Sequence, residues 1–121
     1  MSIHVAAIDL GATSGRVMRA VVDAGRVELT EVARFPNGPV EREDGLHWDA
    51  TALREHIMAG LARAFAEDPA ISSIGIDSWA VDYALLAGGR EVGDPFHYRD
   101  ERTERGVAAV HARIAPDELY G

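Results

Sequence analysis

A chain of 121 residues, 47% of them apolar, is long enough for one domain, or part of one, with a hydrophobic core. The net charge of −8, with twelve arginines and no lysine, argues against nucleic acid as a partner, because phosphate contacts need clustered positive charge. The absence of cysteine excludes disulfides and thiolate zinc sites. We find no signal peptide and no apolar run near 18 residues, so we expect a cytoplasmic protein without a membrane partner.

The first half of the chain predicts three strands and a helix. Three apolar runs separated by short turns favour an antiparallel meander over residues 4–10, 16–22 and 27–35. A loop is predicted from residue 35 to 47. Asp49 is a good N-cap for a helix that ends before Pro69. Apolar residues recur every four positions along that helix, at Leu53, Ile57, Leu61 and Phe65.

The second half predicts two more strands and a second helix. We expect strands over 71–76 and 81–85, a glycine turn over 87–90, and a helix that starts at Asp100 and ends at Pro116. The predicted order is βββ-α-β-β-α, with the fourth strand beside the first. This order is typical of the α/β fold class that contains ribonuclease H-like and actin-like ATPase folds, and fold alone does not give function.

The stretch from Asp9 to Arg16 combines an acid, two glycines and two hydroxyls at the end of the first predicted strand. Glycines allow positive φ and close approach to a ligand, and successive N–H groups in such a turn can hold an anion. Asp9 would approach a phosphate through Mg²⁺, and Arg16 would add positive charge. The stretch is not a Walker A loop, which needs a lysine. An ordinary glycine hairpin with Asp9 capping the turn is the alternative.

Two further stretches carry candidate groups. If the fourth strand lies beside the first, Asp77 ends near Asp9, and two such carboxylates can share a divalent metal. Trp79 offers a flat face for a sugar ring, or it is a core residue. The stretch 97–103 places an aromatic residue and alternating charges at a helix start, where it either lines a cleft or forms a solvated helix end.

Taken together and in order, these stretches resemble the N-terminal part of rhamnulokinases, in the FGGY family of carbohydrate kinases. The resemblance rests on DLGATSGR at residues 9–16, FPNG at 35–38, LHWD at 46–49, IGIDSWAVDY at 74–83 and YRDERT at 98–103. L-Fuculokinases and other sugar kinases of the family share the first of these motifs. The ordered set covers most of the chain.

The resemblance implies an actin-like, two-domain ATPase fold of which residues 1–121 are the N-terminal part of domain I. It implies ATP-dependent phosphorylation of L-rhamnulose to L-rhamnulose 1-phosphate in rhamnose metabolism, with Mg²⁺ as cofactor. The matching ATP-binding residues are Ala12, Thr13, Ser14, Gly15 and Arg16, and Asp9 matches the acid that approaches Mg²⁺. Trp79 and Ala80 fall in the sugar-binding stretch.

Two departures from the family are visible. Ala80 stands where the family usually has a glycine that touches the sugar, and one methyl group in a pocket is worth roughly 1–3 kcal/mol of discrimination. Family members are also several times longer, and the resemblance implies that the catalytic base lies beyond Gly121. We therefore assign no catalytic residue within the chain and expect the chain alone to be inactive.

Alternative functions remain open at this point. The chain could come from an FGGY kinase for another ketose, such as L-fuculose. A ribonuclease H-like nuclease would use Asp9, Glu55 and Asp77 as a metal-binding cluster. A third hypothesis is a domain that keeps the fold and binds a partner without catalysis. The sequence gives no indication of the oligomeric state.

Overall fold

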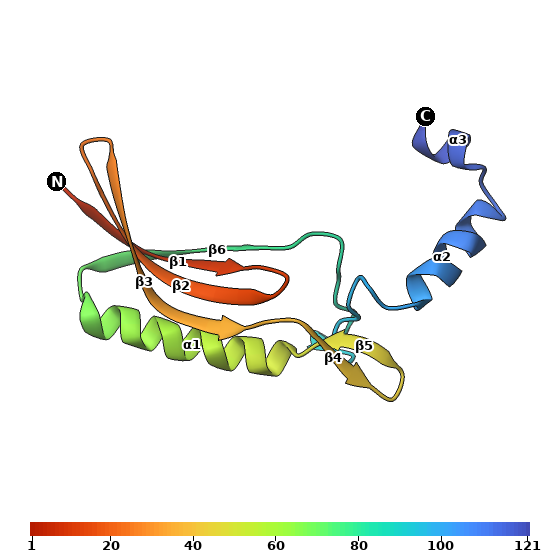
Figure 1. Cartoon of the computed structure of the whole chain (residues 1–121), viewed down its shortest axis with the longest axis horizontal. Coiled ribbons are helices and arrows are strands. Elements are labelled where there is room, and N and C mark those ends of the chain that lie inside the picture. Colours follow the sequence, from red (N-terminus) through yellow and green to blue (C-terminus); the bar gives the residue numbers. More distant parts are fainter. The chain divides into compact units, whose positions relative to one another are not determined.

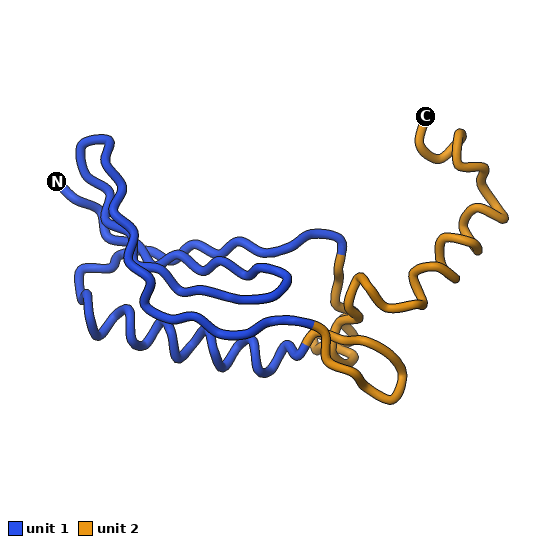
Figure 2. The backbone as a smooth tube through the Cα atoms, in the orientation of Figure 1, with its two compact units in different colours: residues 1–38, 49–81 blue, residues 39–48, 82–121 orange.

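The computed structural model describes all 121 residues (Figure 1). The chain divides into two compact units, residues 1–38 with 49–81 and residues 39–48 with 82–121 (Figure 2). The first unit contains a four-stranded sheet and one long helix. The second contains two short hairpins and two helices. No helix in the chain is both long enough and apolar enough to cross a membrane.

The sheet of the first unit has the predicted topology. Strands β1 (Ile3–Leu10), β2 (Ser14–Asp23) and β3 (Arg26–Pro36) form an antiparallel meander, and β6 (Ile71–Ser78) pairs with β1 in parallel. The resulting order is β3-β2-β1-β6. The predicted α/β fold class is therefore confirmed, including the placement of the fourth strand of this sheet beside the first.

Helix α1 (Ala50–Glu67) covers one face of this sheet (Figure 1). Its predicted N-cap is confirmed, because Asp49 Oδ1 accepts the Ala52 N–H at 2.8 Å. Gly60 of the helix lies directly against Val17, and a Cβ at this position would overlap the valine side chain. Buried apolar side chains from the helix and the sheet form the core: Ala6, Ile8, Leu10, Val17, Val32, Phe35, Ala64 and Ile71. Three of the four predicted stripe residues pack on this core, whereas Phe65 is partly exposed.

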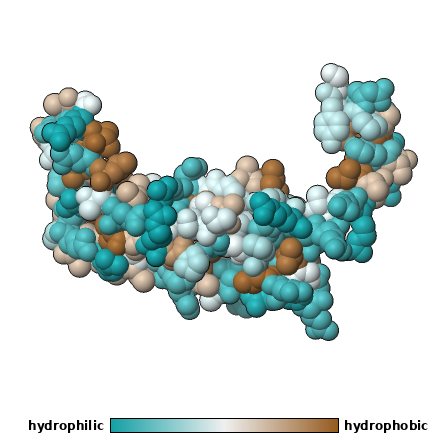
Figure 3. Space-filling view, in the orientation of Figure 1, coloured by the Kyte–Doolittle hydropathy of each residue, from teal (hydrophilic) through white to brown (hydrophobic).

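The helix-facing side of the sheet is not fully covered. Helix α1 contacts β1, β2 and β3. In β6, Ile74 and Ile76 pair with Ala6 and Ile8 and share their face, yet both isoleucines are more than half exposed. Apolar side chains are also exposed at the end of the β2–β3 hairpin, where Figure 3 shows brown surface at the upper left.

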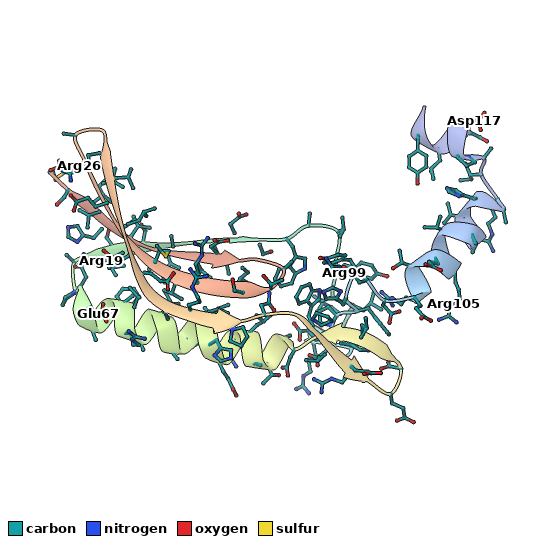
Figure 4. The ribbon with its side chains drawn as sticks, viewed as in Figure 1. Arg19, Arg26, Glu67, Arg99, Arg105 and Asp117 are labelled. Atoms are coloured by element: carbon teal, nitrogen blue, oxygen red, sulfur yellow. The ribbon has the colours of Figure 1, made fainter.

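An ion-pair cluster ties α1 to the start of β1, at the end of the sheet that carries the labelled Arg19 (Figure 4). Asp68, which follows α1, lies 2.6 Å from His4 Nδ1 and 3.7 Å from Arg19 Nη1, and it accepts the Ala70 N–H at 3.0 Å. The hydrogen bond from His4 lowers the pKa of the Asp68 carboxyl. The cluster fixes where the helix ends and β6 begins.

The second unit consists of short elements. Strands β4 (Pro39–Arg42) and β5 (Gly45–Trp48) form one hairpin, and β7 (Leu86–Ala87) and β8 (Arg90–Glu91) form another. Helices α2 (Arg102–His111) and α3 (Pro116–Tyr120) follow. Trp48 and His97 are almost fully buried in this unit, with their ring centroids 4.2 Å apart.

Three sequence-based expectations for this part of the chain are wrong. Residues 81–85 are not a strand: Val81 has φ of 74°, and its side chain and those of Tyr83 and Leu85 are exposed, without a partner strand. The predicted loop over 35–47 instead contains the β4–β5 hairpin. The second helix begins two residues after Asp100, and Pro116 starts α3 rather than ending α2, since proline fits the first turn of a helix.

Candidate nucleotide-phosphate site

The β1–β2 hairpin ends in a two-residue tip. Gly11 N–H donates to Ser14 O at 2.9 Å, which leaves Ala12 and Thr13 as the tip residues. The N–H groups of these two residues donate to no acceptor within the chain. Thr13 is exposed, and its hydroxyl and that of Ser14 add further donors beside the tip. The tip can therefore offer two backbone amides to an anion.

Only part of the stretch from Gly11 to Arg16 can offer its backbone amides to an anion. Gly15 pairs with Leu10 on one side and Phe35 on the other, and Arg16 pairs with Asp9 and Arg34. Their backbone groups belong to the sheet because β2 is an inner strand. The candidate site thus narrows to the amides of the tip, the two hydroxyls and the Arg16 side chain.

The glycines of this stretch serve close packing rather than positive φ. Neither glycine is among the positive-φ residues of the chain. A Cβ at Gly15 would overlap the ring of Phe35, and one at Gly11 would come within 3.1 Å of Ser14 O. The Phe35 ring, which stacks on His56 of α1 at 4.9 Å, occupies the space that a side chain at position 15 would need.

A row of charged residues crosses the sheet on the face opposite α1. Arg34 in β3, Arg16 in β2, Asp9 in β1 and Asp77 in β6 are register partners in that order. Asp9 lies between the core residues Ile8 and Leu10 in β1, so Asp9 and its register partners face away from the helix. Asp9 remains 45% exposed. The row crosses the sheet near the end that carries the β1–β2 hairpin tip.

Ion pairs balance part of this charge. Arg16 Nη2 donates to Asp9 Oδ2. Arg34 donates to Glu31 from Nε at 3.2 Å and from Nη2 at 2.6 Å. The bond to Glu31 raises the pKa of Arg34, with a smaller contribution from Asp9, and the same bond lowers the pKa of Glu31. Arg16 and Arg34 are paired with Asp9 and Glu31, and neither arginine is paired with Asp77. The Asp9–Asp77 end of the row is therefore the more negative end.

The donor chemistry of this end fits Mg²⁺. Carboxylate oxygens are hard ligands, and Mg²⁺ usually binds one or two carboxylates while keeping waters and substrate phosphates. Asp9 and Asp77 supply that number at neighbouring strand ends. The chain contains no group of three or more His, Asp or Glu side chains that would enclose a metal by themselves.

The nuclease cluster is not assembled. Glu55 lies on α1, which covers the face of the sheet toward which Ile8 and Leu10 point. Asp9 points to the opposite face. Because the sheet separates Glu55 from Asp9 and Asp77, the three carboxylates cannot share a metal ion.

Asn37 holds the hairpin tip and was not identified from the sequence as a site residue. Its Nδ2 donates to Gly11 O at 2.6 Å, and its backbone N–H donates to Thr13 O at 3.1 Å. Asn37 is the only side-chain carboxamide in the chain, which contains no glutamine. A single carboxamide in a short loop between two prolines is the sequence signal that could have identified Asn37 as a candidate site residue.

The candidate stretch that contains Trp79 and Ala80 includes both packed and exposed residues. Trp79 is partly buried and packs against the core of the first unit, whereas Ala80 is exposed. In the second unit, Asp82 accepts the Trp48 Nε1–H at 2.5 Å. Asp82 therefore anchors a buried tryptophan.

The third candidate stretch is structural within the second unit. The buried Asp100 carboxylate accepts the Leu46 N–H at 2.7 Å and the Arg102 N–H at 2.9 Å, and these two bonds lower its pKa. Gly45, at φ of 138°, lies so close to Asp100 that a Cβ would overlap the carboxylate. His97 Nδ1 accepts the Arg99 N–H at 3.1 Å. These contacts join the β4–β5 hairpin to the start of α2.

No catalytic base is assigned among residues 1–121. Gly121, beyond which we expect the base, is an exposed residue that follows α3 with φ of 66°. Glycine has no side chain that could accept a proton, so Gly121 is no candidate for this role itself. The location of the base after Gly121 stays a prediction from the family resemblance.

Burial of His97 predicts a pH dependence of stability. Burial lowers its pKa below the ordinary 6.5, the nearby Asp82 partly opposes this, and Arg99 adds to it. The unfolded chain then binds a proton at a higher pH than the folded chain does, so stability is full above about pH 6.5 and falls as the pH drops through that value toward the lowered folded pKa. The pKa values of Asp68 and Asp100 are lowered from the ordinary 3.8, so these two groups change the stability only at more acidic pH.

We expect the midpoint of urea unfolding to decrease when the pH is lowered from about 7.5 to about 5. In His97→Phe, we expect the midpoint to depend less on pH. The measurement is urea unfolding at fixed ionic strength, with His111→Phe as the matched control on an exposed helix. An equal slope in the wild type and His97→Phe would contradict the prediction.

Comparison with known proteins agrees with the sheet topology and the motifs. No protein-family profile matches the chain. A solved structure of a carbohydrate kinase from Novosphingobium aromaticivorans matches it with a TM-score of 0.70 and 25% identity, over 92% of this chain and 23% of that one. The chain thus has the fold of the corresponding part of a carbohydrate kinase.

Curated rhamnulokinases are similar over almost the whole chain. The chain is 43% identical over 120 residues to the rhamnulokinase of Pectobacterium atrosepticum and 41% identical over 116 residues to that of Bacteroides thetaiotaomicron. These matches cover 97% and 95% of the chain and 24% of each relative. The resemblance to rhamnulokinases is confirmed, and the chain spans about a quarter of their length.

Proposed function

We propose that the chain is the N-terminal part of domain I of an ATP-dependent kinase that phosphorylates L-rhamnulose to L-rhamnulose 1-phosphate in the cytoplasm. The observation that carries this proposal is the hairpin tip: two unbonded amides lie beside the Asp9–Arg16 pair, in a chain 43% identical to a rhamnulokinase. A kinase for another ketose, such as L-fuculose, is the second candidate because Ala80 departs from the family's glycine.

The residues of the tip have distinct roles in this proposal. The N–H groups of Ala12 and Thr13 and the hydroxyls of Thr13 and Ser14 bind phosphate oxygens, and Arg16 adds a charged donor. Gly15 contributes by keeping β2 close to Phe35. Asp9 holds Mg²⁺, which when bound neutralises charge on the phosphates. Arg16 must then exchange its bond to Asp9 for one to phosphate.

The sugar site and the catalytic base lie outside the hairpin tip in this proposal. Trp79 and Ala80 form one wall of the sugar site, and no residue from Met1 to Gly121 is proposed as the catalytic base. Phosphoryl transfer needs the base, the metal and in-line placement of the two substrates. We therefore expect residues 1–121 alone to give no turnover.

The complete natural gene product is the material for the test. We expect ATP-dependent phosphorylation of L-rhamnulose, measured as ADP release and as formation of the sugar 1-phosphate, with L-fuculose and D-xylulose as competing substrates. Removal of divalent metal by EDTA should abolish turnover, and added Mg²⁺ should restore it. Absence of phosphorylation of every ketose, or metal-dependent cleavage of RNA, would contradict the proposal.

Ala80→Gly tests the sugar wall. Removing the methyl group should change the ratio of kcat/KM values for L-rhamnulose and L-fuculose about tenfold, since one methyl in a pocket discriminates by roughly 1–3 kcal/mol. The same exchange at the exposed Ala84 is the matched control. Equal ratios in both variants would remove Ala80 from the sugar site.

A further inference from the structure

We propose that Asn37 is a positioning residue for the nucleotide phosphates: its two hydrogen bonds hold the β1–β2 tip so that the Ala12 amide is presented to the phosphate. This inference rests on the proposed function and assigns a role to a residue outside the 12–16 segment. Asn37 comes from the end of β3, where Pro36 pairs with Ser14, so it reaches the tip from the neighbouring strand.

A single peptide unit links Asn37 to the Ala12 amide. Gly11 C=O and Ala12 N–H belong to the same planar trans peptide and point in opposite directions. Asn37 Nδ2 binds Gly11 O at 2.6 Å. The Ala12 N–H is therefore directed away from Asn37, and it donates to no acceptor in the chain.

The second bond fixes the other side of the tip in the same way. The backbone N–H of Asn37 donates to Thr13 O at 3.1 Å, which orients the Thr13–Ser14 peptide. Together with the Gly11–Ser14 bond at 2.9 Å, three hydrogen bonds constrain four residues. A turn held in this way loses little freedom when it binds an anion, so the cost of ordering it is already met before binding.

The carboxamide is required for this task. The side chain must supply a donor, because the acceptor is a carbonyl, and it must not carry a negative charge, because the adjacent ligand is anionic. An aspartate at position 37 would place a carboxylate oxygen against Gly11 O and would add negative charge beside the phosphates. Alanine would leave Gly11 O without its side-chain donor.

The test compares ligands that have and lack phosphate. In the complete gene product, Asn37→Ala should weaken binding of a non-hydrolysable ATP analogue with Mg²⁺ about tenfold, as expected for a lost positioning hydrogen bond. Binding of adenosine and of L-rhamnulose should change less than about twofold on the same grounds. Isothermal titration calorimetry gives all three affinities without turnover. Ser72→Ala, which removes a 3.3 Å bond from a side chain to His4 O in the same sheet, is the matched control.

The outcomes separate this inference from the proposed function. If the wild type does not bind the ATP analogue, the kinase proposal fails. If the wild type binds it and Asn37→Ala binds equally well, only the role of Asn37 is wrong. Equal losses for adenosine, sugar and ATP analogue would also overturn it, since they indicate a general loss of structure. Should Asn37→Ala not fold, Asn37→Asp keeps the shape and the backbone bond, and we expect it to lose more than about tenfold for the ATP analogue alone.

Discussion

Replacement of Asp9 by alanine is expected to lower kcat about a thousandfold at saturating Mg²⁺ and ATP, because a metal that stabilises transferring phosphate charge contributes several kcal/mol. The same change removes the partner of Arg16, which then becomes free to bind phosphate. We therefore expect KM for ATP to stay level or fall while kcat collapses. Steady-state kinetics of the complete gene product, with Mg²⁺ titrated at each ATP concentration, measure both quantities.

The control for Asp9 lies at the other end of the same hairpin. Asp23 is an exposed acid at the end of β2, 3.7 Å from the amino terminus, and Asp23→Ala removes the same charge far from the tip. Its kcat should stay within about twofold of the wild type, as expected for a weak surface pair. An Asp9→Ala enzyme that retains more than a tenth of wild-type kcat would show that Asp9 does not hold the metal.

The neighbouring strand ends were predictable because two general rules coincide. Each of the runs over 4–10 and 71–76 is apolar and is followed by, or includes near its end, an aspartate. A helix between them makes the connection a parallel crossover, which places equivalent strand ends together. The register of Asp9 with Asp77 confirms this reasoning.

The errors in the second unit have a different origin. Its strands are two to four residues long, too short for a period to be read from the sequence. Alternation over 81–85 imitates a strand, but a strand also needs a partner, and a positive φ at Val81 turns the chain instead. Buried contacts of Asp100 with backbone at residue 46 depend on tertiary folding, which local patterns do not encode.

At the candidate site, the sequence indicated a segment whose binding role stays a prediction, and it did not indicate the backbone conformation of that segment. Two glycines suggested positive φ, whereas Gly15 is needed because a ring from the next strand lies over it. The free amides belong to Ala12 and Thr13, which a glycine-based argument does not favour. Asn37 is separated by 26 positions from Gly11, so only the strand register brings the two together.

Trp48→Ala is expected to destabilise the second unit by about 3–5 kcal/mol, the usual cost of removing a buried tryptophan. Trp48 is 1% exposed, its ring lies against His97, and its indole N–H reaches Asp82. The mutation removes this packing and also leaves Asp82 without the indole donor. Trp48→Phe keeps an aromatic ring but loses the hydrogen bond to Asp82 and part of the ring volume, so we expect a smaller loss of about 1–3 kcal/mol.

Hydrogen exchange measures this effect where it arises. The Leu46 and His97 amides donate to Asp100 and to Leu46 O, so their protection reports opening of the second unit. In Trp48→Ala both amides should exchange about a hundredfold faster or more, because about 3 kcal/mol corresponds to a change of that size. Tyr120→Ala removes an exposed aromatic and should leave both rates unchanged. Equal protection in wild type and Trp48→Ala would mean that the tryptophan does not hold the hairpin to the segment before α2.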